Sequence, residues 1–255
     1  MQTDMKAIIT LENKRGQIDL SKPMAIHLPI KNEQKLGAWY VGPPSVRPHI
    51  NGDFVGSIAA GASVNFNDIS FNPHAHGTHT ECVGHIIAGH YEVLASLGQF
   101  IFEALLVSVA PVNVNGDWQI TKDLLVQAFE NTPLPKAVVI RTLPNEDSKK
   151  QTQYSHTNPA YFTETAAAYL CAMGVDHLIV DLPSVDREKD QGALLAHKAF
   201  WNVHGTIRTQ ATISEFAFIP NNIIDGRYML QFGLAPFEND ASPSTLVLYE
   251  FESFL

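Results

Sequence analysis

Five of the chain's 11 histidines lie between positions 74 and 90, within and just after the stretch NPHAHGTHTECVGHI. Spread evenly over 255 residues, the histidines would place fewer than one in a segment of that length. The same stretch also holds a glutamate and a cysteine. Imidazole and carboxylate groups are the usual protein ligands of Zn²⁺, Mn²⁺ and Fe²⁺, so this composition indicates a metal site.

The spacing inside this cluster indicates which residues could share a metal. His79 and Glu81 are two residues apart, so on an extended segment both side chains point to one face. Gly77 permits a sharp bend of the backbone, which would bring in a third imidazole, from His74 or His76. The sequence leaves the choice between these two histidines open.

His85 and Cys82 have other expected roles. His85 lies four residues beyond Glu81, a spacing suited to supporting a ligand or to acid/base chemistry. On a strand, Cys82 would face away from Glu81, so we expect a buried thiol. The alternative for the whole cluster is adventitious binding by a histidine tract, but such a tract would be polar throughout and would lack the Gly-Thr punctuation found here.

The segments that must position this cluster alternate between strand and helix patterns from residue 99 to residue 182. QFIFEALLVSVAPV, KAVVIRTL and VDHLIVDL are too apolar and β-branched for surface strands. Between them, TKDLLVQAFEN has helical spacing with Thr121 as N-cap, and NPAYFTETAAAYLCAMG is a helix that ends at Gly174. This rhythm predicts an α/β domain.

Further elements are expected on either side of this region. MKAIITLE, GQIDLS and SVNFNDISFN are strand-like, and the last of these alternates apolar and polar residues as a half-buried strand would. A helix over DQGALLAHKAFWNVHG precedes three strands over TQATISEFAFI, RYMLQFGLAPF and STLVLYEF. Residues 43–63 form the longest irregular segment, for which a lid over the substrate is the expected role.

Composition excludes several classes of function. The formal net charge of -9 repels polyanions, so no nucleic acid is expected as a partner. No segment approaches the eighteen apolar residues of a membrane span, and the N-terminus shows no export signal. Two cysteines without a CxxC pair suit a reducing compartment, so we expect a cytoplasmic protein. The GxSxG, HExxH, GxxxxGK[ST] and GxGxxG motifs of other enzyme classes are missing.

The segment HGTHTECVGH resembles the HxGTHxDxPxH signature of the cyclase family, which includes bacterial kynurenine formamidases and isatin hydrolases. Further segments are similar to the family in the same order along the chain: IDLSKPMAIHLP (18–29), DLPSVD (181–186), LLAHKAFW (194–201), ISEF (213–216) and ENDASPSTLVLY (238–249). The resemblance implies a single α/β domain over residues 1–255, with a mixed β-sheet core flanked by helices.

The resemblance also implies roles for individual residues. His79 would be a metal ligand, and Glu81 stands in the place of the family's metal-bridging aspartate. His85 would be the acid/base histidine, while His197 and Glu215 would complete a second metal position.

Two departures from the family pattern leave alternatives open. The family's first histidine corresponds to Ala75, which His74 and His76 flank, so either neighbour could serve as a ligand. Additional residues between the two distal positions make His204 a rival to His197.

The expected activity is metal-dependent hydrolysis of an amide, formamide or cyclic amide C–N bond in a small aromatic or carboxylated molecule. A divalent metal, Zn or Mn, as one ion or two, would activate water and polarise the carbonyl group, and His85 would protonate the leaving nitrogen. The resemblance points to an arylformamidase of the kynurenine formamidase kind, as in tryptophan catabolism. Trp39, Tyr40 and Phe54 are candidates for stacking on an aromatic substrate.

Two other functions stay open at this point. A cyclase or dehydratase would use the same polarised carbonyl group, and a non-catalytic metal-binding protein would keep the ligands without turnover. No residues are assigned to an organic cofactor. We also expect a homo-oligomer, a dimer or larger.

Overall fold

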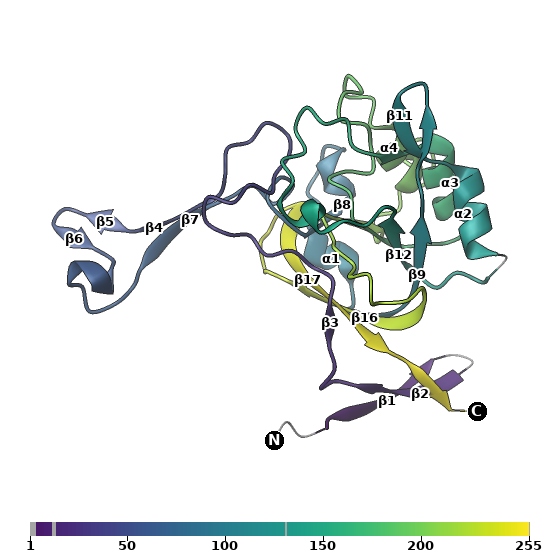
Figure 1. Cartoon of the computed structure of the whole chain (residues 1–255), viewed down its shortest axis with the longest axis horizontal. Helices are drawn as coiled ribbons and strands as arrows, with labels where there is room; N and C mark the ends of the chain where they lie inside the picture. Colours follow the sequence, from purple (N-terminus) through teal and green to yellow (C-terminus); the bar gives the residue numbers. More distant parts are fainter. Residues whose placement is uncertain (1–3, 12–13, 131, 255) are drawn as a thin grey trace.

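The computed structural model describes residues 4–11, 14–130 and 132–254. Its centre is an eight-stranded mixed sheet (Figure 1). Because β16 pairs with both β9 and β17, the sheet closes on itself as a ring of strands, with β3 alongside β17. In spatial order the strands are β16 (Gly226–Leu234), β9 (Ile101–Val109), β12 (Ala137–Thr142), β14 (His177–Val180), β15 (Thr212–Glu215), β8 (His79–Cys82), β17 (Ala241–Glu250) and β3 (Met24–Ala25).

Parallel and antiparallel pairs occupy different parts of this ring. Strands β9, β12, β14 and β15 are parallel neighbours, while β8 runs antiparallel to both β15 and β17. Parallel neighbours need a crossover connection, and three helices lie on these connections. They are α2 (Lys122–Phe129), α3 (Glu164–Ala172) and α4 (Leu195–Phe200). The α/β class with a mixed sheet flanked by helices, expected from the sequence, is confirmed.

Alternating side chains of the parallel strands enter two different apolar layers. On β9, Val107 faces outward and joins Leu125 of α2 and Leu170 of α3 in one layer. Its neighbour Leu106 faces into the ring, where it joins Leu230 of β16 in the other layer. Each fully buried Leu or Val contributes about 1.5–3 kcal/mol of hydrophobic free energy. Coverage of both faces explains why these strands are continuous apolar runs.

The helix ends follow the expected local signals. Thr121 caps α2 by accepting a hydrogen bond from the backbone of Leu124, and Thr163 caps α3 in the same way. Gly174 has a φ of 76°, the left-handed conformation expected beyond a helix end. Helix α3 begins later than predicted, because residues 161–162 form the short strand β13 that pairs with β11.

Smaller sheets and turns surround the ring. One sheet contains β1 (Lys6–Leu11), β2 (Lys14–Asp19) and β18 (Glu252–Phe254), and another contains β10 (Val112–Val114), β11 (Asp117–Ile120) and β13 (Tyr161–Phe162). Two pairs remain, β4 (Ser45–Pro48) with β7 (Asn67–Ser70) and β5 (Ile50–Asn51) with β6 (Phe54–Val55). The short helices are α1 (Val93–Leu97), η1 (Ile58–Ala60), η2 (Val83–His85) and η3 (Asp147–Gln151).

Residues 45–70 form an arm that projects from the body of the molecule (Figure 1). The lid expected over residues 43–63 is therefore wrong within one chain, because this segment extends away from the sheet. The half-buried strand expected over SVNFNDISFN is wrong as well, since all four residues of β7 are exposed. An alternation of apolar and polar residues with a period of two indicates that one face of the strand is covered. The alternation does not identify the surface that covers it.

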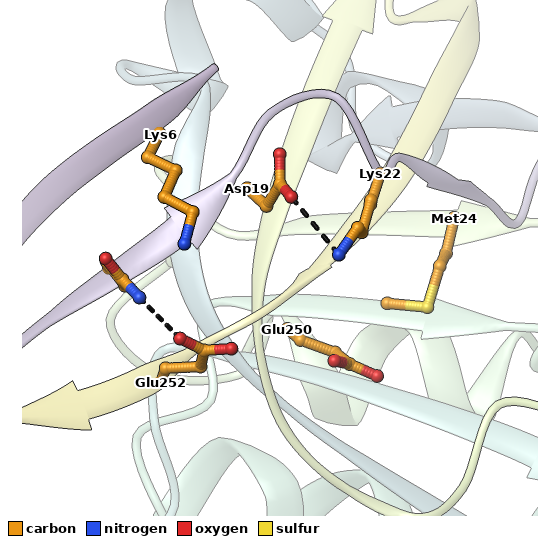
Figure 2. A pocket seen from close by; sticks show the side chains of 7 residues that line it. Lys6, Asp19, Lys22, Met24, Glu250 and Glu252 are labelled. Atoms are coloured by element: carbon orange, nitrogen blue, oxygen red, sulfur yellow. Dashed lines mark hydrogen bonds and ion pairs between the residues drawn. The ribbon is translucent and has the colours of Figure 1, made fainter. Parts of the chain in front are cut away.

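The sheet of β1, β2 and β18 borders a small polar pocket of about 280 Å³ (Figure 2). Its lining side chains are mostly charged, and Lys22 Nζ lies 3.4 Å from a carboxylate oxygen of Asp19. The pocket contains no imidazole or thiol group among its lining residues. In the part of the chain that the structure describes, none of the helices has the length and apolar character needed to cross a membrane.

A buried histidine on β14 makes the stability of this fold sensitive to acid. His177 is packed against the ring of Phe102 at a centroid distance of 4.1 Å, and its Nδ1 lies 2.9 Å from the hydroxyl of Thr212. Burial lowers the pKa of His177 to about 4. Because protonation then favours the unfolded chain, its contribution to stability is present above about pH 6.5 and is lost as the pH falls towards 4, by up to about 3 kcal/mol.

We therefore predict that His177→Gln flattens the pH dependence of the free energy of unfolding between pH 6.5 and 4. Urea unfolding at several pH values measures this slope. The control is His204→Gln, which changes an exposed histidine. Equal slopes for the wild type and His177→Gln would contradict the prediction.

Candidate metal centre

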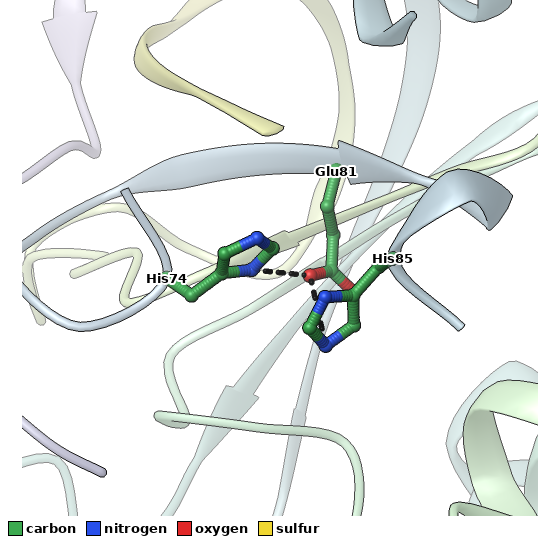
Figure 3. A group of neighbouring side chains, drawn as sticks. All are labelled: His74, Glu81 and His85. Carbon is green, nitrogen blue, oxygen red and sulfur yellow. Dashed lines mark hydrogen bonds and ion pairs between the residues drawn. The ribbon is translucent and has the colours of Figure 1, made fainter. Parts of the chain in front are cut away.

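The carboxylate of Glu81 lies at the centre of a group of four histidines. Its oxygens are 2.9 Å from His74 Nδ1 and 3.0 Å from His197 Nε2. The Nε2 atoms of His79 and His85 are each 3.9 Å from Glu81 Oε2. Figure 3 shows the Glu81 carboxylate reaching between the rings of His74 and His85. The structure thus brings four of the predicted histidines to one carboxylate.

Strand pairing places the first two predicted ligands beside a third. His79 and Glu81 lie on one face of β8, as their spacing predicts. In the antiparallel register, Glu215 of β15 pairs with His79, and its Oε2 lies 3.5 Å from His79 Nε2. Gly77 allows the chain to enter β8, because a Cβ atom at this position would lie 3.1 Å from the carbonyl oxygen of Leu28.

Helix α4 delivers His197 from the opposite direction. Asp186 accepts a hydrogen bond from His197 Nδ1 at 2.6 Å and another from the backbone of Ala196 at 2.7 Å. The carboxylate therefore holds the helix start and leaves Nε2 of His197 facing Glu81. Burial opposes protonation of His197, but Asp186 and Glu81 outweigh it and raise its pKa well above the usual value. A carboxylate behind a histidine is a common support for a metal ligand.

The clearest sign of a cation site is the Nε2 atom of His79. Nδ1 of this ring lies 3.1 Å from the carbonyl oxygen of Gly77, so Nδ1 carries the proton and Nε2 presents a lone pair. Nε2 is buried and has no hydrogen-bond partner, although carboxylate oxygens of Glu81 and Glu215 face it. A lone pair and two carboxylates around one point fit a divalent cation.

Among the residues that the structure describes, two sets of three His and Glu residues have ligand atoms within 4.8 Å of one another. They are His79, Glu81 and Glu215, and His74, Glu81 and His85. Because Glu81 belongs to both sets, the geometry is compatible with one ion or with two ions that share this carboxylate. The nitrogen and oxygen ligands suit Zn²⁺ or Mn²⁺.

Of the two histidines that flank Ala75, only His74 reaches this group. His76 points away, with Nε2 at 2.8 Å from the carbonyl oxygen of Gly42 and Nδ1 accepting a hydrogen bond from the backbone of Asn72. The metal-ligand prediction for His76 therefore has no geometric support. His204 lies exposed in the turn after α4, so of the two distal candidates His197 is the one in the group.

Asp240 is a member of the site that the sequence did not single out. Its Oδ2 lies 3.0 Å from His74 Nε2 and 3.5 Å from His85 Nδ1. Asp240 directly precedes β17, whose first residue, Ala241, pairs with Glu81. The only sequence signal was its position in the segment ENDASPSTLVLY, next to a predicted strand.

The charges of the group stabilise one another against burial. Burial lowers the pKa of His74, but hydrogen bonds to Asp240 and Glu81 outweigh this and raise it to about 10. Burial raises the pKa of Glu81, but His85, His197 and His74 together hold it well below the usual value. Hydrogen bonds from His74 and His85 lower the pKa of Asp240. The carboxylates thus stay ionised and require positive charge around them.

The site has a buried floor and an open side. Glu81 and His79 have side chains that are 1% and 0% exposed, whereas His85 is 31% exposed and Asp240 is 26% exposed. The part of the site that is most open to solvent therefore lies on the side of His85 and Asp240. The site is not a surface feature alone, because its floor is part of the packed sheet.

The three aromatic residues proposed for substrate stacking have different positions. Trp39 donates a hydrogen bond from Nε1 to the carbonyl oxygen of His74 at 3.1 Å, so it supports the turn that carries this histidine. Tyr40 is exposed and donates a hydrogen bond to Glu188. Phe54 lies in β6 on the projecting arm, away from the metal centre of its own chain (Figure 1). The stacking prediction for Phe54 is therefore wrong within one chain.

Comparison with known proteins identifies one matching family. The sequence pattern of the family described as "Putative cyclase" matches residues 18–187. Among curated proteins, no sequence matches the chain.

Several solved structures share the fold. The "predicted metal-dependent hydrolase from Bacillus stearothermophilus" is 18% identical, with a TM-score of 0.62 over 89% of this chain and 98% of that one. A "potential metal-dependent hydrolase with cyclase activity" is also 18% identical, with a TM-score of 0.64 over 89% and 97%. Isatin hydrolase A from Labrenzia aggregata is 11% identical, with a TM-score of 0.64 over 89% and 93%. At these identities the likeness concerns the fold.

We predict that the double variant His79→Ala, Glu81→Ala loses its divalent metal. The two residues supply an imidazole and the carboxylate shared by both sets of ligands. Elemental analysis of the purified protein should find less than about one-tenth of the wild-type metal content, since removing ligands lowers affinity by many tenfold steps. His76→Ala is the matched control and should retain metal. A folded double variant with full metal content would contradict the assignment.

We also predict that Asp186→Asn weakens metal binding by about 10- to 100-fold, the usual effect of losing such a support. An amide nitrogen in place of Oδ2 would donate to Nδ1 of His197 and move the ring proton to Nε2, the atom that faces Glu81. Competition with a chelator measures the affinity.

Asp190→Asn is the control for this prediction. Asp190 accepts backbone hydrogen bonds from Gly192 and Leu194 just before the same helix, but it has no contact with His197. Equal metal affinity in the two variants would show that Asp186 does not act through His197.

Proposed function

The chain belongs to the cyclase family, and on that premise we propose that it is a metal-dependent hydrolase of a small amide. The bond cleaved is an amide, formamide or cyclic amide C–N bond, as in an arylformamidase. The observation that carries this proposal is the lone pair of His79 Nε2, which is buried without a partner between the carboxylates of Glu81 and Glu215. A buried nitrogen lone pair without a partner costs free energy of folding, and a bound cation would offset this cost.

Five residues would hold the metal. They are Glu81, the three histidines whose nitrogen atoms face its carboxylate, and Glu215, whose carboxylate faces two of these histidines. The histidines are His74, His79 and His197. A bound Zn²⁺ or Mn²⁺ supplies Lewis acidity, which lowers the pKa of water and polarises a carbonyl group. A second ion, where present, would share Glu81 with the first, and His74 and His197 would hold it from the other side of that carboxylate.

His85 is proposed as the proton carrier. Its Nδ1 faces Asp240 at 3.5 Å, and its Nε2 faces Glu81 at 3.9 Å, so the ring lies between an outer and an inner carboxylate. Its partial exposure places it where a substrate enters. Departure of an amine requires a proton on nitrogen, and a positioned imidazole can deliver it. Asp240 would orient the ring by accepting a hydrogen bond from the Nδ1–H group.

The likeness to solved structures supports the substrate class. The fold is similar to that of proteins named isatin hydrolases, and isatin contains a cyclic amide. A formamide of an aromatic amine, as in kynurenine formamidase chemistry and tryptophan catabolism, has the same reacting group.

Two other functions use the same site. A cyclase or dehydratase would need the polarised carbonyl group and the pair of His85 and Asp240 as acid and base. One similar structure is described as a potential metal-dependent hydrolase with cyclase activity, and this description supports a cyclase as the second candidate. A non-catalytic metal-binding protein would need the ligands but not His85. Turnover of formanilides and of isatin-like cyclic amides, with and without chelator, separates these functions.

The cellular location is proposed from the cysteines. Cys82 and Cys171 are both free, and Cys82 is buried. A chain without disulfides suits a reducing compartment, so we propose the cytoplasm.

We predict that His85→Ala lowers kcat by about 10²- to 10⁴-fold, the usual contribution of a positioned acid/base group. Metal content should be unchanged, because all five residues proposed to hold the metal remain. Steady-state kinetics on a hydrolysed amide, together with elemental analysis, measures both quantities. Loss of metal would make His85 a ligand, and wild-type turnover would place the proton path elsewhere.

A further inference from the structure

A cavity of about 450 Å³ lies at the carboxyl ends of the parallel strands β12 and β14. Thr142, the last residue of β12, and Asp181, which directly follows β14, are part of its lining. We call it the Trp118 pocket, after the half-exposed ring of β11 that also lines it. Ligand sites of α/β proteins are commonly found at this end of parallel strands, and the volume suits a small organic molecule.

A buried phenylalanine separates the Trp118 pocket from the metal centre. Phe216 is 2% exposed, and the centroid of its ring lies 5.8 Å from that of Tyr154, which lines the pocket, and 6.1 Å from that of His79. The backbone of Phe216 donates a hydrogen bond at 2.8 Å to the carbonyl oxygen of Leu182, another lining residue. None of the described residues that line the pocket belongs to the metal centre. The pocket is therefore a compartment of its own.

The two charged residues of the pocket lining neutralise one another. Lys149 Nζ donates hydrogen bonds to a carboxylate oxygen of Asp181 at 2.7 Å and to the carbonyl and hydroxyl oxygens of Thr142 at 2.7 and 2.8 Å. These bonds use all three protons of the ammonium group. Asp181 also accepts hydrogen bonds from the backbone and the hydroxyl of Thr142. A charged ligand would lose its hydration here without gaining a counter-charge, so the pocket favours an uncharged one.

The other walls of the pocket are mainly apolar and stiff. Prolines and aromatic rings lose little side-chain entropy when they are fixed against a ligand, so binding to them has a small ordering cost. The rings of Trp118 and Tyr154 favour a planar aromatic ligand, which can stack on them or meet them edge to face. Three prolines and two leucines complete these walls: Pro111, Pro144, Pro159, Leu143 and Leu182.

The wall formed by residues 154–160 is held in an unusual backbone conformation. Asn158 and His156 have φ values of 48° and 68°, in the left-handed region. Glu188 accepts hydrogen bonds from the backbone of both residues, and Asp117 accepts one from the side-chain amide of Asn158 at 2.9 Å. Such conformations persist only where surrounding contacts fix the backbone, and they are common at ligand sites. The wall is thus formed before any ligand arrives.

One hydrogen-bond donor of the pocket is open. The backbone of Tyr154 is bonded to Gly37 and Thr157, but its hydroxyl has no hydrogen-bond partner among the described residues. The single fully buried polar side-chain atom without a partner in this part of the chain belongs to His79, so the Tyr154 hydroxyl must reach open space. Burial and the charge of Asp181 raise the pKa of Tyr154, which keeps the hydroxyl protonated.

We propose that the Trp118 pocket is a second ligand site, which binds a planar, uncharged aromatic compound that carries a carbonyl group. The aromatic ring would lie against Trp118 and the prolines, and the carbonyl oxygen would accept a hydrogen bond from the Tyr154 hydroxyl. This inference does not depend on the reaction that the metal centre performs.

The first test locates the bound molecule. Indanone is the probe, because it is a flat, uncharged aromatic ketone without an amide bond to cleave. The chain has three tryptophans, of which Trp118 lines the pocket, Trp39 contacts the turn of His74 and Trp201 is buried in the core. Fluorine NMR of protein labelled with fluorotryptophan observes each of them, and Trp118→Phe assigns the pocket signal.

Indanone should shift the Trp118 signal and leave the other two unchanged. The dissociation constant should be on the order of 0.1–1 mM, as expected for a ligand of about ten non-hydrogen atoms. A carboxylate derivative of indane, which is charged, should bind at least about tenfold more weakly. A shift confined to Trp39 would place the ketone at the metal centre, and an unchanged Trp118 signal at about 10 mM indanone would show an empty pocket. Either result would overturn the proposal.

The second test concerns the hydrogen bond. Tyr154→Phe should raise the dissociation constant of indanone by about 3- to 10-fold, the usual effect of losing one hydrogen bond. The same variant should bind indane, which lacks the carbonyl group, as the wild type does. Tyr169→Phe is the matched control, because Tyr169 lies on α3 outside the pocket. A general disturbance of the pocket would weaken both compounds equally, and that result would contradict the assignment of Tyr154.

Discussion

The buried carboxylate of Glu81 is the interaction on which the rest of the structure depends. A carboxylate that is 1% exposed would cost several kcal/mol of folding free energy if it were unpaired. Four imidazoles surround it, delivered by the turn before β8, by β8 itself, by η2 and by α4. Each of these segments must therefore be fixed in space before the charge can be tolerated, and a divalent cation would complete the compensation.

The closed ring of strands provides this fixed frame. Strand β8 pairs with β15 on one side and with β17 on the other. Hydrogen bonds along both edges therefore fix the positions of His79 and Glu81. Apolar layers inside and outside the ring stabilise the frame. Asp186 and Asp240 then orient His197 and His74 from outside the ring, which leaves little freedom for the ligands. Rigid ligands of this kind favour a metal site over a fluctuating ion pair.

Local patterns predicted most of the elements, and the exceptions have physical causes. The apolar runs of β9, β12 and β14 and the threonine caps of α2 and α3 are local properties, so they could be read from neighbouring residues. The alternation around Phe66 also predicted a covered face, but nothing in the alternation specifies the covering surface. On the arm this face is exposed within the chain.

The sequence by itself determined the chemical types at the site and the pairing of His79 with Glu81 on one face, because both follow from residue identity and a period of two. It could not decide between His74 and His76, since the direction of each ring depends on the turn and on Trp39, a residue from a distant loop. It assigned no role to Asp240, which lies 166 residues from His74 in sequence and reaches it only through strand pairing. Contacts between distant segments are set by the topology of the sheet, and only the tertiary structure contains that information.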